Sequence, residues 1–415
     1  MTLDIFFILL ACIFGLIMTW GVGANDLANI MSTTMGSKAV TVRQAMMIAV
    51  VFEFAGAFFG GGHVTSTIRT GIINVNLVSP HELLIYGMLA ILLAGSVWMW
   101  LASFVGMPVS ITNAVVGALV GFGSIVLGMD TVHWDKVKYI ALSWVLSPLI
   151  AGVVAYLCFL YIRKNILSRT DPAKAVKRYA PFFLFLVGVL LSIMIVLKGL
   201  AHFNIALSAV ENIGLDVFMA LLVVLVGYGM ITKIKLKSQG LHDQLVYVEK
   251  VFSLLMALTA CAMVFAHGSN DVAIAVGPIA AIIGLTMHGS NLSASTPLPS
   301  WVILLGCTGV IIGLFTYGKK VIATVGSGIT ALTPSRAFVA TLAAATTVVV
   351  STSTGTPVSA TQTLVGAVLG VGLARGIGAL NLSVIRNIFT SWVVTIPATA
   401  LLAIIFFYIL RAIFS

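Results

Sequence analysis

An Asn-Asp pair occurs twice within long apolar stretches of this chain, as Asn25-Asp26 and as Asn270-Asp271. A carboxylate in hydrocarbon costs on the order of 3 kcal/mol or more, so each aspartate needs a partner or a task. Carboxylate and amide oxygens are hard donors that suit Na⁺ or a proton. Asn29 lies three residues after Asp26, on the same helical face. These residues predict a cation site formed by Asn25, Asp26, Asn29, Asn270 and Asp271.

Glycines stand close to both pairs, at Gly21 and Gly23 before the first and at Gly268 before the second. Because glycine weakens a helix, we expect local unwinding that frees backbone carbonyls beside the carboxylates. The alternative is that each aspartate only caps a broken helix or pairs with a neighbouring amide. Two matching carboxylates at membrane depth favour the cation site.

Three of the twelve acidic residues lie well inside apolar runs, namely Asp26, Asp271 and Glu53. Glu53 is therefore a candidate for coupling or gating. His267 directly precedes Gly268, and it suits either a proton relay or an ordinary hydrogen-bonded interfacial position. We expect no cofactor other than a co-transported Na⁺ or H⁺.

A second repeated pattern, Pro-Val-Ser-x-Thr, begins at Pro108 and again at Pro357. Proline suits the first turn of a helix, so both segments predict the start of a half-helix. A helix N-terminus offers free N–H groups and a partial positive charge. Nearby hydroxyls add donors, so we predict an anion cradle that contains Ser110, Thr112, Ser359 and Thr361.

Neither 106–124 nor 355–373 contains a lysine or an arginine. An oxyanion in this cradle would lack a formal countercharge, so a cation bound at Asp26 and Asp271 makes electrostatic sense. Coupling of an anion to a cation follows as a hypothesis. The alternative is that the small Ser, Thr and Gly residues only permit close packing of helices.

Hydrophobic residues make up 60% of the 415 residues, and charged residues make up 8%. Soluble domains carry roughly 25% charged residues, so a soluble protein is excluded. The backbone can be satisfied in lipid only by helices or a closed barrel, and no period-2 alternation is present. We predict an all-α polytopic membrane protein of about 12 transmembrane segments, over 5–24, 44–62, 83–105, 108–128, 138–162, 181–200, 213–231, 251–268, 300–317, 337–354, 357–374 and 388–410.

Three motifs recur in the same order, with offsets of 245, 249 and 248 residues. They are the Asn-Asp pair, the Pro-Val-Ser segment and the Ser-Trp-Val that begins at Ser143 and Ser391. Such a series indicates an internal repeat. The first half contains five segments, so the second half begins on the opposite side of the membrane. We predict two inverted-topology repeats with broken or re-entrant helices: 1–163 is the first repeat, 164–244 holds basic loops and two central helices, and 245–415 is the second repeat.

Positive charge is unevenly distributed between the predicted loops. With the N-terminus outside, seventeen of the 22 lysines and arginines fall on the cytoplasmic side and five fall outside. This positive-inside bias predicts that the N-terminus and the C-terminus both lie outside. Because topology explains the net charge of +10, we expect no nucleic-acid partner.

Together these residues resemble the inorganic phosphate transporter (PiT) family over essentially the whole chain. That family carries Gly-Ala-Asn-Asp-x-Ala-Asn and His-Gly-(Ala/Ser)-Asn-Asp-Val-Ala, one per inverted half, and a Pro-x-Ser-Thr-Thr segment in each half. The corresponding segments here are 23–29, 267–273, 108–113 and 357–362. The segment 52–57, which contains Glu53, is similar to the family's glutamate helix.

The resemblance implies a symporter that takes up inorganic phosphate with low affinity by alternating access, driven by Na⁺ or H⁺. It implies a multi-pass protein of the bacterial plasma (inner) membrane, in contact with the lipid bilayer, and a possible homodimer. The cation ligands carried over from the family, including those for Na⁺, are Asn25, Asp26, Asn270 and Asp271. The phosphate ligands carried over are Ser110, Thr112, Ser359 and Thr361.

The chain departs from the family pattern at several positions. The usual Ser-Thr-Thr-His of the first half is Ser-Ile-Thr-Asn, which ends at Asn113, and the second half reads Ser-Ala-Thr-Gln. Each cradle thus lacks one hydroxyl. Ile274 replaces an asparagine, and Thr341 replaces a glutamate. These departures keep open a symporter for a related oxyanion such as sulfate or arsenate.

Two other functional classes fit these residues less well. An intramembrane aspartyl protease would use two membrane carboxylates as a dyad. Those enzymes carry Tyr-Asp and Gly-x-Gly-Asp, whereas both aspartates here follow asparagine. A passive anion channel is disfavoured by carboxylates near the pore and by the lack of basic residues along it. We therefore expect a transporter and no enzyme.

Overall fold

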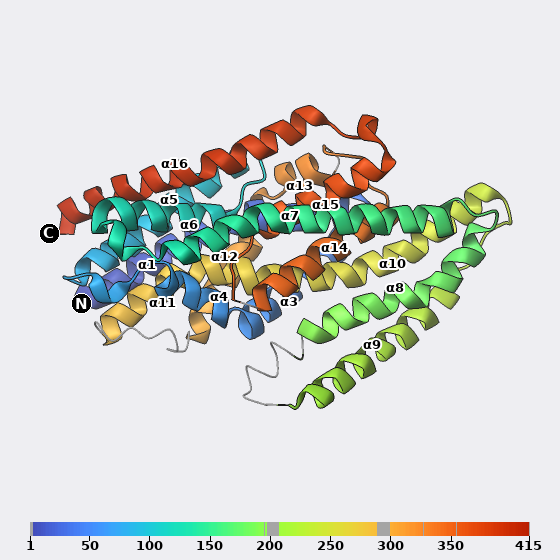
Figure 1. The fold of residues 1–415 in the computed structure, drawn as a ribbon, viewed down its shortest axis with the longest axis horizontal. Coiled ribbons are helices and arrows are strands. Elements are labelled where there is room, and N and C mark those ends of the chain that lie inside the picture. The colour runs from blue at the N-terminus through green and yellow to red at the C-terminus, as the bar shows by residue number, and fades with distance from the viewer. Residues whose placement is uncertain are drawn as a thin grey trace.

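The protein is built of helices that lie largely along one long axis (Figure 1). The structure, a computed structural model, describes residues 3–194, 196, 207–288, 299–326, 328–353 and 355–414. The helices are α1 (Leu3–Val22), α2 (Ala28–Gly36), α3 (Val42–Gly60), α4 (Gly62–Ser66), α5 (Glu82–Val105), α6 (Ile111–Gly121), α7 (Trp134–Ile162), α8 (Pro172–Met194), α9 (Ala209–Thr232), α10 (Leu241–His267), α11 (Ala273–His288), α12 (Ser300–Tyr317), α13 (Lys319–Gly326), α14 (Pro334–Ser353), α15 (Ala360–Arg375) and α16 (Leu382–Phe414). Between them lie π-helical turns at Gly23–Leu27, Thr67–Gly71, Phe122–Leu127, Arg163–Leu167 and Gly268–Val272, and 3-10 turns at Val75–Leu77, Met129–Thr131 and Ile377–Ala379.

The prediction of an all-α polytopic membrane protein is confirmed. Within the described residues, ten helical spans are long and apolar enough to cross a membrane. The two predicted runs that open with Pro-Val-Ser are shorter helices, Ile111–Leu127 and Ala360–Arg375. The last residues of the predicted runs 181–200 and 337–354 lie outside the described residues. Within the described residues, the twelve predicted segments therefore correspond to ten long spans and two half-helices.

Each half-helix is the second arm of a hairpin, with α5 leading into α6 and α14 leading into α15. Gly106 and Gly355, at the two tips, have φ angles of 78° and 72°. Glycine adopts this left-handed conformation at little cost, so the chain can turn sharply there. Ser110 and Ser359 then cap the new helices, each accepting a backbone N–H three residues further on.

The two Asn-Asp pairs lie inside continuous helices, so the unwinding expected from the nearby glycines is wrong. Helical spans run unbroken over Leu3–Gly36 and Leu241–Met287. At the pairs themselves, Gly23–Leu27 and Gly268–Val272 form π-helical turns. A π-turn widens the helix by one residue and occurs frequently at functional sites. Both halves therefore use the same local distortion, a wider turn instead of a break.

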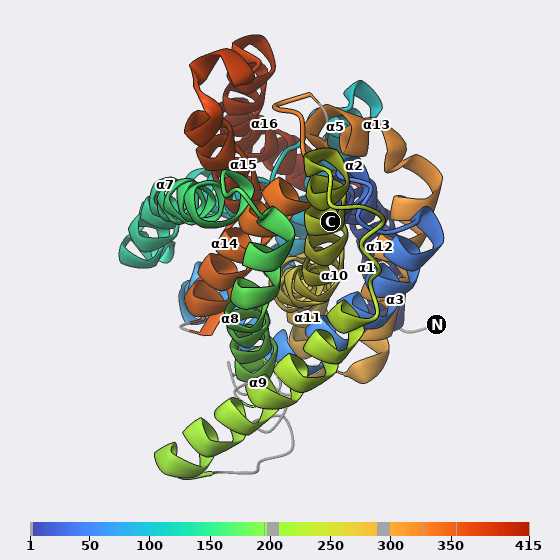
Figure 2. The same cartoon turned by 90° about the vertical axis from the view of Figure 1, so that its right-hand side faces the viewer.

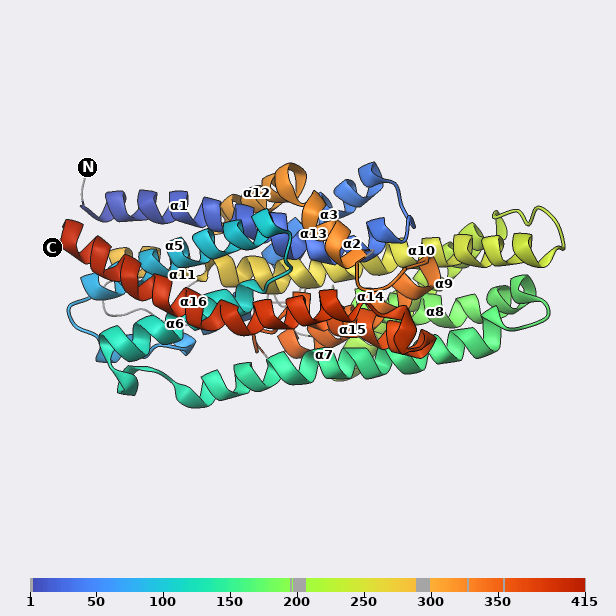
Figure 3. The same ribbon diagram turned by 90° about the horizontal axis from the view of Figure 1, so that it is seen from above.

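The helices that carry the two pairs run in opposite directions along the long axis. In Figure 3, α1 and α2 lead away from the N-terminal end, whereas α10 and α11 lead toward it. The described termini lie together, since the rings of Phe6 and Phe414 contact with centroids 5.5 Å apart. Inverted-topology repeats produce such an arrangement. The repeat boundaries, and the side of the membrane on which the termini lie, stay predictions.

Helix packing follows the same pseudo-symmetry. Helix α1 packs on α12 as α10 packs on α3, and α6 packs on α16 as α15 packs on α7. Glycines let the first two pairs touch backbone to backbone. A Cβ on Gly313 would overlap the carbonyl oxygen of Trp20, and a Cβ on Gly56 would overlap that of Phe265. Trp20 and Phe265 are 245 positions apart, the offset of the Asn-Asp pairs, so both halves make the same contact.

Helices α8 and α9 form a hairpin at the edge of the bundle (Figure 2). Helix α8 packs on α10, and α9 packs mainly on α8. Only 11% of the apolar window of α9 is buried. The two helices between the halves therefore stand apart from the motifs that carry chemistry.

The glycine contacts lead to a first prediction. We expect Gly313→Ala to lower the stability by about 1–3 kcal/mol, because the new Cβ forces two backbones apart. Gly56→Ala, its counterpart in the other half, should cost a similar amount. Melting temperatures of the detergent-purified variants measure the loss.

The control is Gly214→Ala on α9, where a Cβ would meet nothing within 4 Å. Gly214→Ala should leave the melting temperature unchanged or slightly raised, because alanine favours the helix. Equal melting temperatures for all three variants would contradict the close crossing.

Candidate functional site

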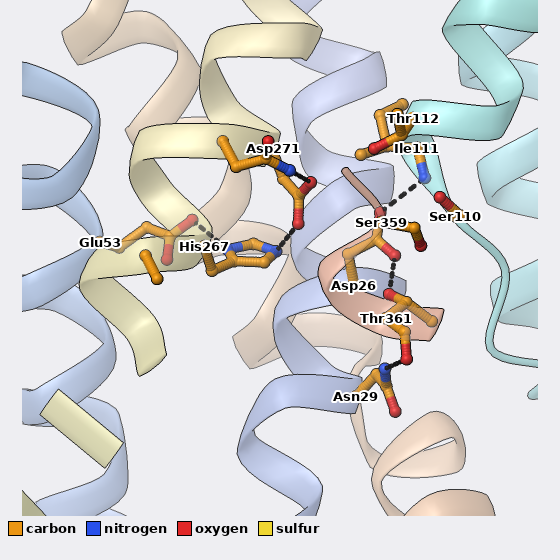
Figure 4. A network of polar contacts seen from close by, with 12 residues as sticks. Asp26, Asn29, Glu53, Ser110, Ile111, Thr112, His267, Asp271, Ser359 and Thr361 are labelled. Carbon is orange, nitrogen blue, oxygen red and sulfur yellow. Dashed lines mark hydrogen bonds and ion pairs between the residues drawn. The ribbon is translucent and has the colours of Figure 1, made fainter. Parts of the chain in front are cut away.

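The predicted site residues lie together inside the bundle, where α1, α3 and α10 meet the tips of both hairpins (Figure 4). Each of the side chains predicted for the cation site, the anion cradle and the gating position is at most 2% exposed. The contacts join the two halves, since Asp26 bonds Thr361, 335 positions later. The sequence placed these residues in two separate motifs per half, and the fold makes them one cluster.

The two asparagines each hold a hairpin tip by its backbone. Asn25 donates from Nδ2 to the carbonyl oxygen of Met107 at 2.9 Å and accepts the N–H of Val109 at 2.9 Å. Asn270 donates to the carbonyl oxygen of Val358 at 2.6 Å and accepts the N–H of the same residue at 3.4 Å. These bonds satisfy backbone groups that the proline-containing turns leave outside any helix. The asparagines therefore have a structural task beside the predicted cation contact.

Asp26 connects both hairpins. Its Oδ2 accepts the backbone N–H of Ile111, the first residue of α6, at 3.0 Å. Its Oδ1 accepts the hydroxyl of Thr361 at 2.5 Å. A carboxylate at a helix N-terminus is stabilised by the free N–H groups and the helix dipole. One carboxylate thus contacts both half-helices.

Asn29 lies beside Asp26, as its spacing predicted, and its amide contacts the second half. Nδ2 lies 3.5 Å from the carbonyl oxygen of Thr361. Oδ1 is buried and has no hydrogen-bond partner. Buried polar atoms are normally paired, so this oxygen is available to a ligand. Asp26 and Asn29 thus offer oxygens that suit a sodium ion.

Asp271 has a different environment, because three titratable side chains, Glu53, His267 and Asp271, contact one another in a row. His267 Nδ1 lies 2.7 Å from Glu53 Oε1, and His267 Nε2 lies 3.1 Å from Asp271 Oδ2. Asn270 Nδ2 donates to Asp271 Oδ1 at 2.6 Å. Figure 4 shows this row running from α3 through His267 to the π-turn. Asp271 thus contacts Asn270 and His267 of its own half, and its Oδ2 lies near His267 without a hydrogen-bond partner among the described residues.

His267 is the residue that sequence reasoning left undecided between a relay and an ordinary position. Its spacing of four residues from Asp271 puts both on one helical face, and this signal was present in the sequence. The contact with Glu53, 214 residues earlier, carried no local signal. Glu53, which was predicted for coupling or gating, is connected to Asp271 through His267.

The first half lacks the equivalents of Glu53 and His267. The offset of 245 puts Val22 opposite His267. Gly23 and Gly268 begin the two π-turns, and their neighbours identify the counterpart of Glu53. A Cβ on Gly268 would overlap the backbone of Glu53, and a Cβ on Gly23 would overlap that of Val310, so Val310 takes the place of Glu53 in the first half. The pseudo-symmetric sites therefore differ in chemistry, because two valines take the positions that His267 and Glu53 have in the second half.

The four predicted anion-binding hydroxyls are buried between the hairpins, with different engagements. Ser110 and Ser359 act as capping acceptors for the N–H groups of Asn113 and Gln362, at 3.3 and 3.1 Å. An acceptor hydroxyl still has its proton to give to an oxyanion. Thr112 donates to the carbonyl oxygen of Val358 at 2.9 Å, so it ties one hairpin to the other.

Two of the departures from the family pattern, Thr341 and Ile274, occupy buried core positions. Thr341 Oγ1 lies 3.0 Å from Thr33 Oγ1, and both side chains are buried. Ile274 is fully buried, 245 residues after Asn29. An isoleucine supplies no oxygen, so the extra amide ligand exists in the first half only.

The electrostatics of the cluster favour a cation. Three buried carboxylates and one histidine meet here, whereas 106–124 and 355–373 contain no lysine or arginine. Burying uncompensated negative charge is costly, so a bound cation lowers the energy of this arrangement. The half-helix N-termini and hydroxyls suit an anion next to that cation. The arrangement can therefore hold an oxyanion and a cation side by side.

Comparisons with known proteins agree with this chemistry. The model of the phosphate transporter family matches residues 22–403. A protein of Haemophilus influenzae described as "Putative phosphate permease" is 46% identical over 411 residues, which are 98% of this chain and 97% of the relative. A Pyrococcus furiosus protein with the same description is 41% identical over 400 residues, 96% and 95% of the two chains. A solved structure, "The sodium-dependent phosphate transporter", is 38% identical, with a TM-score of 0.89 over 98% of this chain and 99% of that one.

The site geometry predicts a stability difference between two asparagines. Asn25→Ala unpairs the carbonyl of Met107 and the N–H of Val109, and each unpaired buried group costs about 1–3 kcal/mol. Asn29→Ala removes one contact of 3.5 Å and an unpartnered oxygen, so it should lower the melting temperature much less. Thermal unfolding of both variants in detergent measures the difference. Equal losses would contradict the assignment of Asn25 to the hairpin tip.

Proposed function

The chain belongs to the phosphate transporter family, and from this premise we propose that it is a cation-coupled symporter for inorganic phosphate that works by alternating access. One observation carries the proposal: two half-helix N-termini with buried hydroxyls face buried carboxylates, without a lysine or arginine in either hairpin. An anion in such a place needs a cation next to it. A site that holds an anion and a cation next to each other suits transport of both together.

We propose Na⁺ as the driving ion and H⁺ as the alternative. The oxygens of Asp26 and Asn29 suit a sodium ion, and the similar solved structure is described as sodium-dependent. The chain of Glu53, His267 and Asp271 is the feature that suits a proton instead. The phosphate ligands proposed are Ser110, Thr112, Ser359 and Thr361, and the cation ligands are the two Asn-Asp pairs with Asn29.

Alternating access is supported by the position of the site between two halves of opposite orientation. Asp26 of the first half bonds Thr361 of the second, and Asn270 of the second holds the tip next to Ser359. A movement of the helices that carry the Asn-Asp pairs against the two hairpins would alter these contacts. We further propose a bacterial plasma membrane location with both termini outside, transport without enzymatic activity, and a homodimer, whose mass light scattering in detergent would measure.

The test is uptake of ³²P-phosphate into proteoliposomes under an imposed Na⁺ or H⁺ gradient. We expect accumulation driven by Na⁺, reduced at least about tenfold by Asp271→Asn because one charge of the cation site is lost. Asp135→Asn, which removes an exposed carboxylate at the start of α7, should leave uptake within about twofold. Excess sulfate should compete weakly.

Three other results would contradict parts of the proposed function. Uptake that ignores both gradients would indicate a passive channel. Accumulation driven by H⁺ alone would replace Na⁺ by the proton. Strong inhibition by sulfate or arsenate, with little phosphate uptake by a folded and inserted protein, would identify another oxyanion as the substrate.

A further inference from the structure

Asp26 and Asp271 occupy matching positions of the repeat, and their contacts differ. Asp26 takes both of its hydrogen bonds from the hairpins, through Ile111 and Thr361. Asp271 takes its contacts from Asn270 and His267, and His267 is fixed in turn by Glu53. Thr112, which matches Thr361 at the offset of 249, bonds a backbone carbonyl instead of Asp271. Asp26 is therefore hydrogen-bonded to the cradle, whereas Asp271 is hydrogen-bonded to Asn270 and paired with His267.

The groups that bind Asp26 are those that an oxyanion needs. A free N–H at the start of a half-helix and a threonine hydroxyl are the donors expected of a phosphate site. Each gives its hydrogen bond to one carboxylate oxygen of Asp26, at 3.0 Å from Ile111 and 2.5 Å from Thr361. A carboxylate is itself an oxyanion. The protein's own side chain thus occupies one donor from each half of the cradle.

We propose that Asp26 is an internal competitor of phosphate, and that a cation must draw its carboxylate away before phosphate can bind to Ile111 and Thr361. The inference rests on the proposed function and adds an order of events to it. Two anions cannot share the same donors, and their like charges repel. A cation bound beside Asp26 removes both obstacles, because it turns the carboxylate toward itself and neutralises it.

The structure shows where that cation would be held. Asn29 is on the same helical face, three residues after Asp26, and its Oδ1 is buried and unpartnered. Among the described residues, Asp26 has no hydrogen bond or ion pair with Glu53, His267 or Asp271, and the repeat puts Val22 and Val310 where the second half has His267 and Glu53. Asp26 therefore has two alternatives, the hairpin donors or a cation shared with Asn29. Asp271 has different neighbours, because Ile274 replaces the asparagine and His267 Nε2 lies 3.1 Å from its Oδ2.

The experiment measures binding of inorganic phosphate, as its choline salt, to the purified protein with and without NaCl. We expect the wild type to bind phosphate at least about tenfold more tightly with NaCl, because sodium releases the donors. Asp26→Asn should bind phosphate more tightly than the wild type when sodium is absent, so the sodium dependence falls below about threefold. Calorimetry in detergent gives both dissociation constants.

Asp271→Asn is the matched control, because it removes the same charge from the matching position. It should weaken sodium binding without improving phosphate binding in the absence of sodium. If both variants improve sodium-free binding equally, general electrostatics explains the effect and the proposal is overturned. If folded Asp26→Asn binds phosphate neither with nor without sodium, Asp26 belongs to the anion site and the proposal is again overturned.

A second variant tests the proposal even if Asp26→Asn does not fold. Thr361→Val removes one donor that holds Asp26, so the carboxylate becomes more available and sodium alone should bind about threefold more tightly. Thr399→Val makes the same change at a buried threonine of α16 and should leave sodium binding unchanged. Weaker sodium binding by Thr361→Val would overturn the proposal. A wild type that binds sodium but no phosphate would instead refute the proposed function.

Discussion

Buried negative charge without a basic partner in the hairpins is the constraint on which the rest of this structure depends. Three carboxylates lie inside a membrane-spanning bundle, where each would be costly if it were unpaired. The groups that contact two of these carboxylates carry little or no formal charge. They are a helix N-terminus and a hydroxyl for Asp26, and an amide and an imidazole for Asp271. The hairpins exist at these positions because only an interrupted helix presents free N–H groups inside the bilayer. The negative charge left over attracts a cation, which fits the proposed symport.

The pseudo-symmetry of the bundle is strict for backbones and relaxed for side chains. Glycines place α1 on α12 and α10 on α3 in the same way, and both Asn-Asp pairs lie on π-turns. At matching positions beside the aspartates, however, the second half has a histidine and a glutamate where the first has valines. Shared geometry keeps both sites at one depth between the hairpins. Different neighbours allow one aspartate to be fixed while the other can exchange partners, which two identical sites would not allow.

Much of this arrangement could be predicted from the sequence, because apolar runs, turn residues and repeated motifs act locally. The helical spans and the half-helices that follow Pro108 and Pro357 follow from patterns within a few residues, and the repeat of the motifs indicates the matching sites. The π-turns did not, since glycine beside a polar pair is compatible with unwinding or widening, and packing against Val310 and Glu53 decides between them. Contacts between distant residues were also beyond local patterns. Glu53 meets His267 only because α3 crosses α10.

The distribution of close backbone contacts supports the proposal of alternating access. Through glycines, α1 and α3 touch α12 and α10, so these four helices form one tightly packed set. Likewise α6 touches α16 at Gly117 and Gly121, and α15 touches α7 at Gly366 and Gly370. Helices α5 and α14 pack on both sets, and the site between the sets is bridged by side-chain hydrogen bonds such as those of Asn25 and Asp26. Packed backbones resist sliding, whereas hydrogen bonds can exchange partners with a ligand. In the proposed mechanism, movement of one set against the other breaks these contacts while ions and phosphate replace them, which would couple occupancy of the site to its access.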